Sequence, residues 1–224
     1  MSAKDILTRE QIDDGLERLP HWRYRLGGLH AVFKLPTSRA TLDLMARIGD
    51  LAEHANHHPD VDWRYNLLFV RLISHDAGGE VTARDMELAK QISAAAQTAG
   101  ATAEPRLSRT LELAIDTDDP AAISETWRAA LGYKAGRSGD LTDPHGRLPT
   151  LWFQQTETPN PNRMHVDIHV SLTDSGQVLD EVAATPATLD QESAPRFVVV
   201  RDSQGNRLCV CTEEGRGPDV QPGL

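Results

Sequence analysis

The chain has 224 residues, 39% of them hydrophobic and 25% charged, and its formal net charge is −10. This length suits two domains of about 100 residues each, and the apolar content allows both to bury a core, which argues against a disordered chain. The acidic charge, shared by both halves, argues against a nucleic-acid partner, and no apolar run approaches the roughly 20 residues of a membrane span.

The first hundred residues predict a small domain. Charges alternate in the N-terminal segment, where a signal peptide would be apolar, so we expect a cytoplasmic protein. Thr8 and Gln11 have the spacing of a helix capping box, and Gly27-Gly28 is typical of a hairpin turn. In chain order we expect a helix over 8–19, a hairpin over 22–35, a helix over 39–54, a loop over 56–62, a strand over 65–74 and a helix over 82–99. The order α-β-β-α-β-α predicts an α+β sandwich with helices on one antiparallel sheet.

The remaining residues predict a second domain that follows a linker at 101–106. Its expected elements are a strand over 107–117, a helix over 120–131, strands over 134–137, 149–155 and 163–172, a helix over 175–184, and strands over 197–201 and 207–212. This repetition indicates two tandem modules of βαβββ type, whose paired sheets would leave a cleft between them. We therefore predict domains at 1–103 and 107–214, followed by a tail at 215–224.

The two cysteines, Cys209 and Cys211, lie two residues apart in the last predicted strand. Side chains at this spacing point to the same face, so a disulfide between them would distort the strand. We expect both to be buried thiols.

A histidine cluster is the main chemical signal of the first half. Within 22 residues the chain places His54, His57, His58 and His75. Because histidine titrates near neutrality, such a cluster can both donate and accept protons. Pro59 stiffens the loop that carries the adjacent pair, and Glu53 and Asp85 supply carboxylates on the flanking helices.

The residues alone leave other interpretations open. The histidines can be solvated loop residues, and Asp85 can be only the capping-box partner of Thr82. A zinc site is a third interpretation, although no spacing in this region matches a standard zinc pattern. Its ligands would come from Glu53, His54, His57 and His58.

A longer pattern resembles the signature of the pterin-4a-carbinolamine dehydratase family. The pattern is an acid, three residues, His-His-Pro, an aromatic residue, a histidine after the next strand and an aspartate in the following helix. In this chain these are Glu53, His57-His58-Pro59, Tyr65, His75 and Asp85. The resemblance also includes His21-Trp22 and the AVFKL run around Phe33, and it spans residues 4–99. Val61, Asp62 and Trp63 depart from the usual residues after the proline, and the turn after His75 is one residue longer.

This resemblance implies a hydro-lyase that removes water from a 4a-hydroxytetrahydropterin and leaves a quinonoid dihydropterin. It implies that no metal and no redox cofactor takes part, and that the enzyme serves tetrahydropterin recycling beside an aromatic amino acid hydroxylase. It also implies a homo-oligomer.

The resemblance further implies roles for the site residues. His57 and His75 would be the acid/base pair, and His58 would bind or orient the pterin. Glu53 and Asp85 would fix tautomers or hydrogen-bond the ring. The aromatic contacts to the pterin face would come from Trp63 or Tyr65.

The second half resembles a glyoxalase-like domain of the vicinal oxygen chelate superfamily over residues 107–213. The resemblance rests on LELAIDTDDP, AISETWRAALGY, NRMHVDIHV and RDSQGNRLCVC. Metal-using members place His or Glu on inward strand positions of both modules, with a Glu near the position of Cys209. Glu112 and His165 are the remaining candidates, so the set is incomplete and we expect a metal-free binding or structural domain. Trp152 and Phe153 are expected in the core.

Two alternatives to a dehydratase remain. The first is a non-catalytic pterin-binding or regulatory protein that keeps the scaffold. The second is a metal-dependent lyase or dioxygenase whose site lies in the second half.

Overall fold

The computed structural model describes residues 5–136, 138–158, 162–203 and 205–214. Within these ranges the chain divides into two compact units, one that ends at Ser108 and one that begins at Arg109. We call them the N-terminal unit and the C-terminal unit. The predicted tail, 215–224, lies outside the described residues. None of the described helices is both long enough and apolar enough to cross a membrane.

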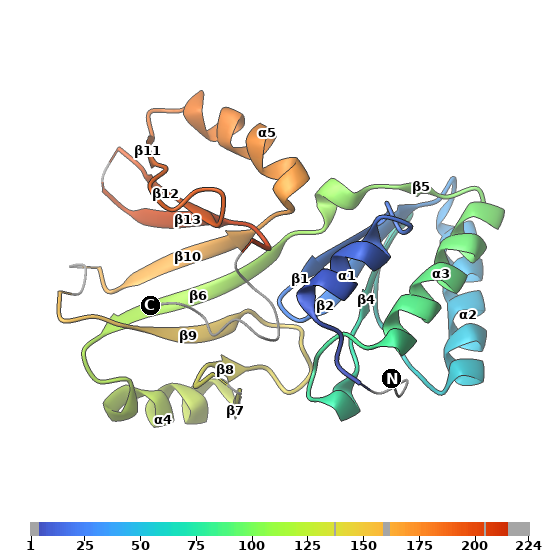
Figure 1. The fold of residues 1–224 in the computed structure, drawn as a ribbon, viewed down its shortest axis with the longest axis horizontal. Coiled ribbons are helices and arrows are strands. Elements are labelled where there is room, and N and C mark those ends of the chain that lie inside the picture. Colours follow the sequence, from blue (N-terminus) through green and yellow to red (C-terminus); the bar gives the residue numbers. More distant parts are fainter. Residues whose placement is uncertain (1–4, 137, 159–161, 204, 215–224) are drawn as a thin grey trace. The chain divides into compact units, whose positions relative to one another are not determined.

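The N-terminal unit is a sheet covered by helices. Its elements are α1 (Arg9–Leu16), β1 (Trp22–Arg25), β2 (Gly28–Lys34), α2 (Ser38–Ala55), β3 (Asp60–Arg64), β4 (Leu67–Leu72), the 3-10 turn η1 (His75–Ala77), α3 (Ala83–Thr98), β5 (Thr102–Ala103) and the 3-10 turn η2 (Pro105–Leu107). The strands pair antiparallel in the order β1-β2-β4-β3, and β5 pairs with β2. Helices α2 and α3 lie side by side (Figure 1).

The α+β class is confirmed, but the structure adds β3 to the expected order. This strand, Asp60–Arg64, falls partly in the predicted loop. All five of its residues are exposed, because it pairs only with β4 at the edge of the sheet, so it has no alternation of buried and exposed positions to detect. Two smaller expectations also change. The first hairpin turns at Leu26-Gly27, both with positive φ, and the predicted linker contains the short strand Thr102–Ala103.

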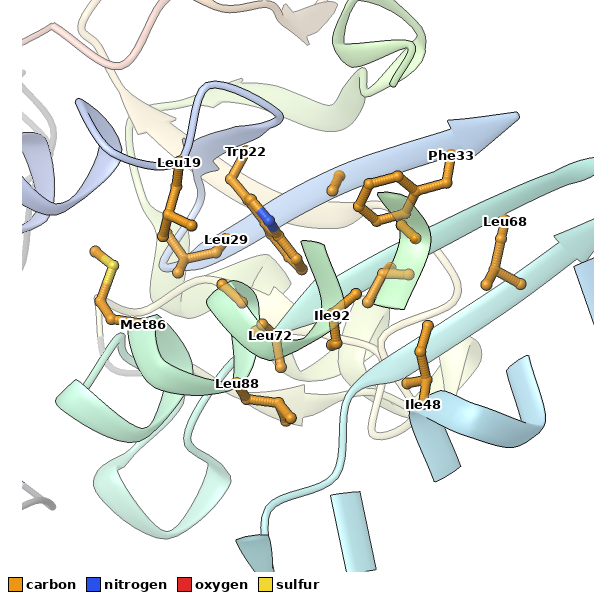
Figure 2. Close-up of a cluster of buried hydrophobic side chains, with 14 of the residues drawn as sticks. Leu19, Trp22, Leu29, Phe33, Ile48, Leu68, Leu72, Met86, Leu88 and Ile92 are labelled. Atoms are coloured by element: carbon orange, nitrogen blue, oxygen red, sulfur yellow. The ribbon is translucent and has the colours of Figure 1, made fainter. Parts of the chain in front are cut away.

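An apolar core joins α2 and α3 to the sheet, as Figure 2 shows. Trp22 and Phe33 come from the first hairpin and meet edge to face, with ring centroids 6.3 Å apart. The Trp22 indole N–H donates to Ser93 Oγ at 2.9 Å, so the buried ring has a polar partner on α3. Each fully buried side chain of this size contributes about 1.5–3 kcal/mol. This packing holds α2 and α3 against the sheet.

The C-terminal unit is one eight-stranded sheet with two helices. Its elements are β6 (Thr110–Thr117), α4 (Pro120–Leu131), β7 (Lys134–Ala135), β8 (Leu141–Thr142), β9 (Thr150–Gln155), β10 (Met164–His169), α5 (Leu172–Ala183), β11 (Thr188–Asp190), β12 (Phe197–Arg201) and β13 (Arg207–Cys211). The strand order is β11-β12-β13-β10-β6-β9-β8-β7. Each module has the pattern βαβββ, as predicted, and the two modules join where β6 pairs antiparallel with β10. Figure 1 shows α4 beside β8 and β9, and α5 beside β12 and β13.

Candidate functional site

The end of α2 places His57 inside the N-terminal unit. Asn56 ends the helix in a left-handed conformation, with φ 46°, and this turns the chain sharply. The next side chain, His57, is only 6% exposed and reaches the first turn of α3. Its Nε2 lies 2.7 Å from Asp85 Oδ1, across 28 positions of sequence.

Asp85 is fully buried and is held by several donors. Its Oδ2 accepts hydrogen bonds from the Thr82 backbone N–H at 2.8 Å, the Thr82 hydroxyl at 3.0 Å and the Ser74 hydroxyl at 2.7 Å. Burial on its own raises the pKa of this carboxyl. The hydrogen bonds from His57, Thr82 and Ser74 outweigh burial, so the pKa of Asp85 lies below its ordinary value. Asp85 is therefore an ionised carboxylate that accepts the Nε2 proton of His57.

The other two histidines of the signature lie at the surface beside carboxylates. His58 is 57% exposed, and its Nε2 lies 3.0 Å from Glu53 Oε1. His75 is 68% exposed, and its Nε2 lies 4.0 Å from Asp60 Oδ1. Asp60 also accepts from Arg71 Nη1 at 3.3 Å. Both imidazoles are thus open to a ligand.

Contacts and chain neighbours link the three histidines in one region. His57 contacts Asp85, which binds Ser74, and Ser74 directly precedes His75. On the other side, His75 faces Asp60, which follows His58 after a single proline. The structure therefore brings together the predicted residues Glu53, His57, His58, His75 and Asp85.

The two predicted aromatic contacts lie farther along the edge strand. Trp63 follows Asp60 by three residues of β3, about 10 Å along the strand, and Tyr65 lies beyond the end of β3 in the turn that leads to β4. Trp63 is 42% exposed, and its indole N–H donates to the backbone carbonyl of Tyr65. Tyr65 is 76% exposed and has a positive φ of 54°. No contact to the histidines positions either ring within the described residues.

The sequence did not reveal three features of this site. These are Asp60, Ser74 and the contacts that the Thr82 hydroxyl makes in addition to capping α3. Thr82 caps α3 and completes the capping box with Asp85, as predicted, but its hydroxyl also contacts Ser74 at 2.8 Å. The capping-box interpretation of Asp85 is therefore correct, and its second carboxylate oxygen contacts His57. The only sequence signal for Ser74 is its position directly before His75.

The C-terminal unit buries a second set of polar side chains on one face of its central strands. On β10, the buried positions alternate with the apolar Met164 and Val166, which are more exposed. The buried polar and thiol side chains of this face are Glu112, Asp116, His165, Asp167, His169, Cys209 and Cys211. Both cysteines are free thiols, as predicted. Glu112 pairs with His169, whose Nε2 lies 2.8 Å from Glu112 Oε2, and does not share a cluster with His165.

The remaining groups form a cluster around His165. One ligand atom each from His165, Asp167 and Cys209 lies within 4.8 Å of the others. Arg207 Nη2 lies 2.6 Å from His165 Nδ1 and 3.1 Å from Asp116 Oδ1. Burial, opposed by the carboxylates and aided by Arg207, lowers the pKa of His165. Burial, aided by Asp167, raises the pKa of the Cys209 thiol to about 12. The imidazole and the thiol are therefore both neutral.

The two aromatic residues of β9 divide between the faces of the sheet. Phe153 packs with the core under α4, as predicted. Trp152 instead points to the polar face, where its indole N–H donates to Asp167 Oδ2 at 3.1 Å. Its ring meets that of His165 edge to face at 5.8 Å.

Comparison with known proteins finds a family match in each half of the chain. Residues 5–95 match the family model of pterin 4 alpha carbinolamine dehydratase, and residues 112–211 match that of a glyoxalase-like domain. A protein of Mycolicibacterium smegmatis named "Putative pterin-4-alpha-carbinolamine dehydratase" is 35% identical over 88 residues, which cover 39% of this chain and 93% of that protein. A protein of the same name from Mycobacterium tuberculosis is 38% identical over 89 residues, which cover 40% of this chain and 94% of the relative.

Two solved structures resemble parts of the chain. A transcriptional coactivator/pterin dehydratase from Brucella melitensis is 28% identical and covers 41% of this chain and 99% of its own, with a TM-score of 0.40. A member of the glyoxalase/bleomycin resistance protein/dioxygenase superfamily from Vibrio splendidus is 16% identical and covers 47% of this chain and 99% of its own, with a TM-score of 0.33. On the family model and the sequence relatives, the chain belongs to the pterin-4a-carbinolamine dehydratase family through residues 5–95, and its residues 112–211 match the model of a glyoxalase-like domain.

Proposed function

We propose that the N-terminal unit dehydrates a 4a-hydroxytetrahydropterin by histidine-based general acid/base catalysis. In this reaction the C4a–O bond breaks, and the departing hydroxyl takes a proton and leaves as water. A ring nitrogen loses its proton, and the electron pair released forms the double bond of the quinonoid dihydropterin. The protein must therefore supply one acid and one base, a task for which imidazoles are suited at neutral pH.

The buried contact between His57 and Asp85 carries this proposal. Because an ionised Asp85 accepts the Nε2 proton, Nδ1 is the ring nitrogen of His57 left for chemistry. A carboxylate in this position also stabilises the positive charge that forms when Nδ1 takes up a proton. We assign His57 as the base that removes the ring-nitrogen proton.

The exposed histidines supply the other roles. We assign His75 as the acid that protonates the departing hydroxyl, since it is exposed and directly follows Ser74 of the same polar network. His58, held by Glu53 at the surface, would orient the pterin. Trp63 and Tyr65 stay predicted contacts to the pterin face.

We assign Asp85 as a positioning residue. Both of its carboxylate oxygens already accept hydrogen bonds within the protein, and no part of it is exposed. Of the two roles that its family resemblance implies, fixing the tautomer of a histidine is the one that this burial favours.

The physiological setting of this proposal rests on the family. The substrate would come from an aromatic amino acid hydroxylase that oxidises its tetrahydropterin, and the reaction would serve pterin recycling. A homo-oligomer is proposed on the same basis.

Stopped-flow kinetics with enzymatically generated 4a-hydroxytetrahydropterin test the proposal. We expect the full-length protein to accelerate dehydration, and His75→Ala to lower the rate by about 10²–10⁴-fold, the usual contribution of one acid/base group. Because His75 is 68% exposed, its removal leaves the core intact.

His54→Ala is the matched control, since His54 is an exposed histidine on the last turn of α2. It should keep the wild-type rate. A folded wild type that binds pterin without accelerating dehydration would favour the non-catalytic alternative, and a fully active His75→Ala would remove His75 from the mechanism.

A further inference from the structure

The cluster around His165 has the donors of a metal site. The metal-using members of the superfamily that residues 107–213 resemble bind their ion at inward strand positions, and His165, Asp167 and Cys209 occupy such positions on β10 and β13. Their ligand atoms lie within 4.8 Å of one another, and all three residues are buried. Asp167 Oδ1 makes no hydrogen bond within the described part of the chain. Donor type and spacing are therefore compatible with an ion such as Zn²⁺.

The charge at this position does not fit a resident metal. Arg207 Nη2 lies 3.5 Å from His165 Nε2, and a metal bound to that nitrogen would sit about 2.0 Å from it. The ion would thus lie within about 5.5 Å of a guanidinium, which stays positively charged in proteins. The two charges would repel strongly in a buried site.

Arg207 itself acts as a cation beside the cluster, on the Nδ1 side of His165. Its single nitrogen Nη2 contacts acceptors from three strands: Asp116 Oδ1 at 3.1 Å on β6, Gln154 Oε1 at 3.1 Å on β9 and His165 Nδ1 at 2.6 Å on β10. A metal ion would gather ligands from neighbouring strands in the same way. The positive charge of the guanidinium also compensates the negative charge of Asp116, which like Asp167 is buried.

We propose that Arg207 is a built-in cation whose charge, held beside His165, keeps the His165–Asp167–Cys209 cluster a latent metal site. The intact C-terminal unit would then take up no divalent metal at this cluster, and removal of the guanidinium would open it. No residue of the N-terminal unit takes part, so the inference is independent of the proposed dehydratase activity.

Cobalt binding to the full-length protein tests this proposal. A thiolate bound to Co²⁺ gives a charge-transfer band in the near ultraviolet, and the chain has two cysteines, both on β13. We expect no such band from the wild type. Arg207→Met, which keeps an unbranched stem and removes the guanidinium with its charge, should bind one Co²⁺ per chain at least about a hundredfold more tightly than the wild type.

Three further variants locate the ion. The band of Arg207→Met should disappear when Cys209→Ser is added and persist when Cys211→Ser is added. Arg207→Lys retains a positive charge and should stay without the band. A thiolate band from the wild type, or its absence from a folded Arg207→Met, would overturn the proposal.

A second substitution covers the case in which Arg207→Met does not fold. Arg207→Gln also removes the charge but keeps hydrogen-bonding groups toward Asp116 and His165, and it should show the band as well. Equilibrium dialysis of the wild type against Zn²⁺ gives a separate reading. One equivalent retained by the wild type and lost in Cys209→Ser contradicts the proposal, whereas no retention at this cluster supports it.

Discussion

Both units bury a histidine beside carboxylates, yet they differ in what they leave for a ligand. In the N-terminal unit, Asp85 binds one nitrogen of His57, while His58 and His75 remain exposed nearby. In the C-terminal unit, a guanidinium from Arg207 lies among the acceptors and contacts His165 itself. A buried polar cluster can bind or protonate a ligand only if some of its polar groups are not already hydrogen-bonded to other groups of the protein.

The electrostatic surroundings of the two histidines, His57 and His165, also differ. The pKa of Asp85 lies below its ordinary value because donors surround it, so an ionised carboxylate faces His57. The pKa of His165 is lowered by burial, with Arg207 adding to the effect, so the second imidazole stays neutral. In the second cluster, burial is the largest cause and the guanidinium of Arg207 acts in the same direction.

The largest expected effect is on the chemical reactivity of the Cys209 thiol, which should be strongly protected from alkylation. Burial and Asp167 raise the pKa of Cys209 to about 12, so about a thousandfold less thiolate forms than for an ordinary thiol. We expect iodoacetamide to label Cys209 at least about a thousandfold more slowly in the native protein than in concentrated urea, with peptide mass spectrometry as the measurement. Rapid labelling of Cys209 in the native state would mean that the cluster is open to solvent.

The next largest expected effect is on stability, when the carboxylate of Asp85 is replaced. Asp85→Asn leaves the donors of Ser74, Thr82 and His57 without an anion, so we expect the free energy of unfolding to fall by about 3 kcal/mol at pH 7 in urea titrations. Since the folded pKa of Asp85 is depressed, its stabilisation is present above the unfolded pKa of about 3.9 and is lost as pH falls through the folded value. The gap between wild type and variant should therefore narrow below about pH 4.

Asp76→Asn is the control for this comparison. Asp76 is a half-exposed carboxylate that pairs with Arg84, so its loss should cost less than about 1 kcal/mol. Equal losses from the two variants would contradict the special role of Asp85.

The smallest effect on stability is expected at the surface of the first site. Glu53→Gln weakens an exposed contact to His58 and should lower the free energy of unfolding by less than about 0.5 kcal/mol. If Glu53 orients His58 for pterin binding, the same variant should raise KM for dehydration and leave kcat nearly unchanged. Glu125→Gln, which weakens an exposed pair with Arg128 in the C-terminal unit, should change neither constant. An unchanged KM in Glu53→Gln would mean that Glu53 has no role in pterin binding and is only a solvated residue at the end of α2.

Local features of both units could be predicted from the sequence. The capping boxes at Thr8 and Thr82 depend on residues three positions apart, and both are present in the structure. Gly132 ends α4 in a left-handed conformation, which glycine adopts without strain. The tandem modules were also predictable, because repeated periodicity is a property of the sequence itself.

Contacts between distant residues could not be predicted in the same way. His57 and Asp85 are 28 positions apart, and Arg207 and Asp116 are 91 apart, so no periodicity relates them. The histidines stand in a family signature that assigns them roles, whereas Arg207 lies within the RDSQGNRLCVC stretch with no role that points to Asp116 or His165. Strand β3 escaped prediction because an edge strand that is exposed on both faces has no apolar pattern.

One carboxylate both starts helix α3 and orients His57. Asp85 Oδ2 accepts the Thr82 backbone N–H that caps the helix, and Oδ1 holds the imidazole. The helix cannot lose its first turn without releasing the histidine, so the formation of the site is tied to the nucleation of α3. Loss of order in that single turn would separate Asp85 from His57, which couples local fraying of the helix to the arrangement of the proposed site.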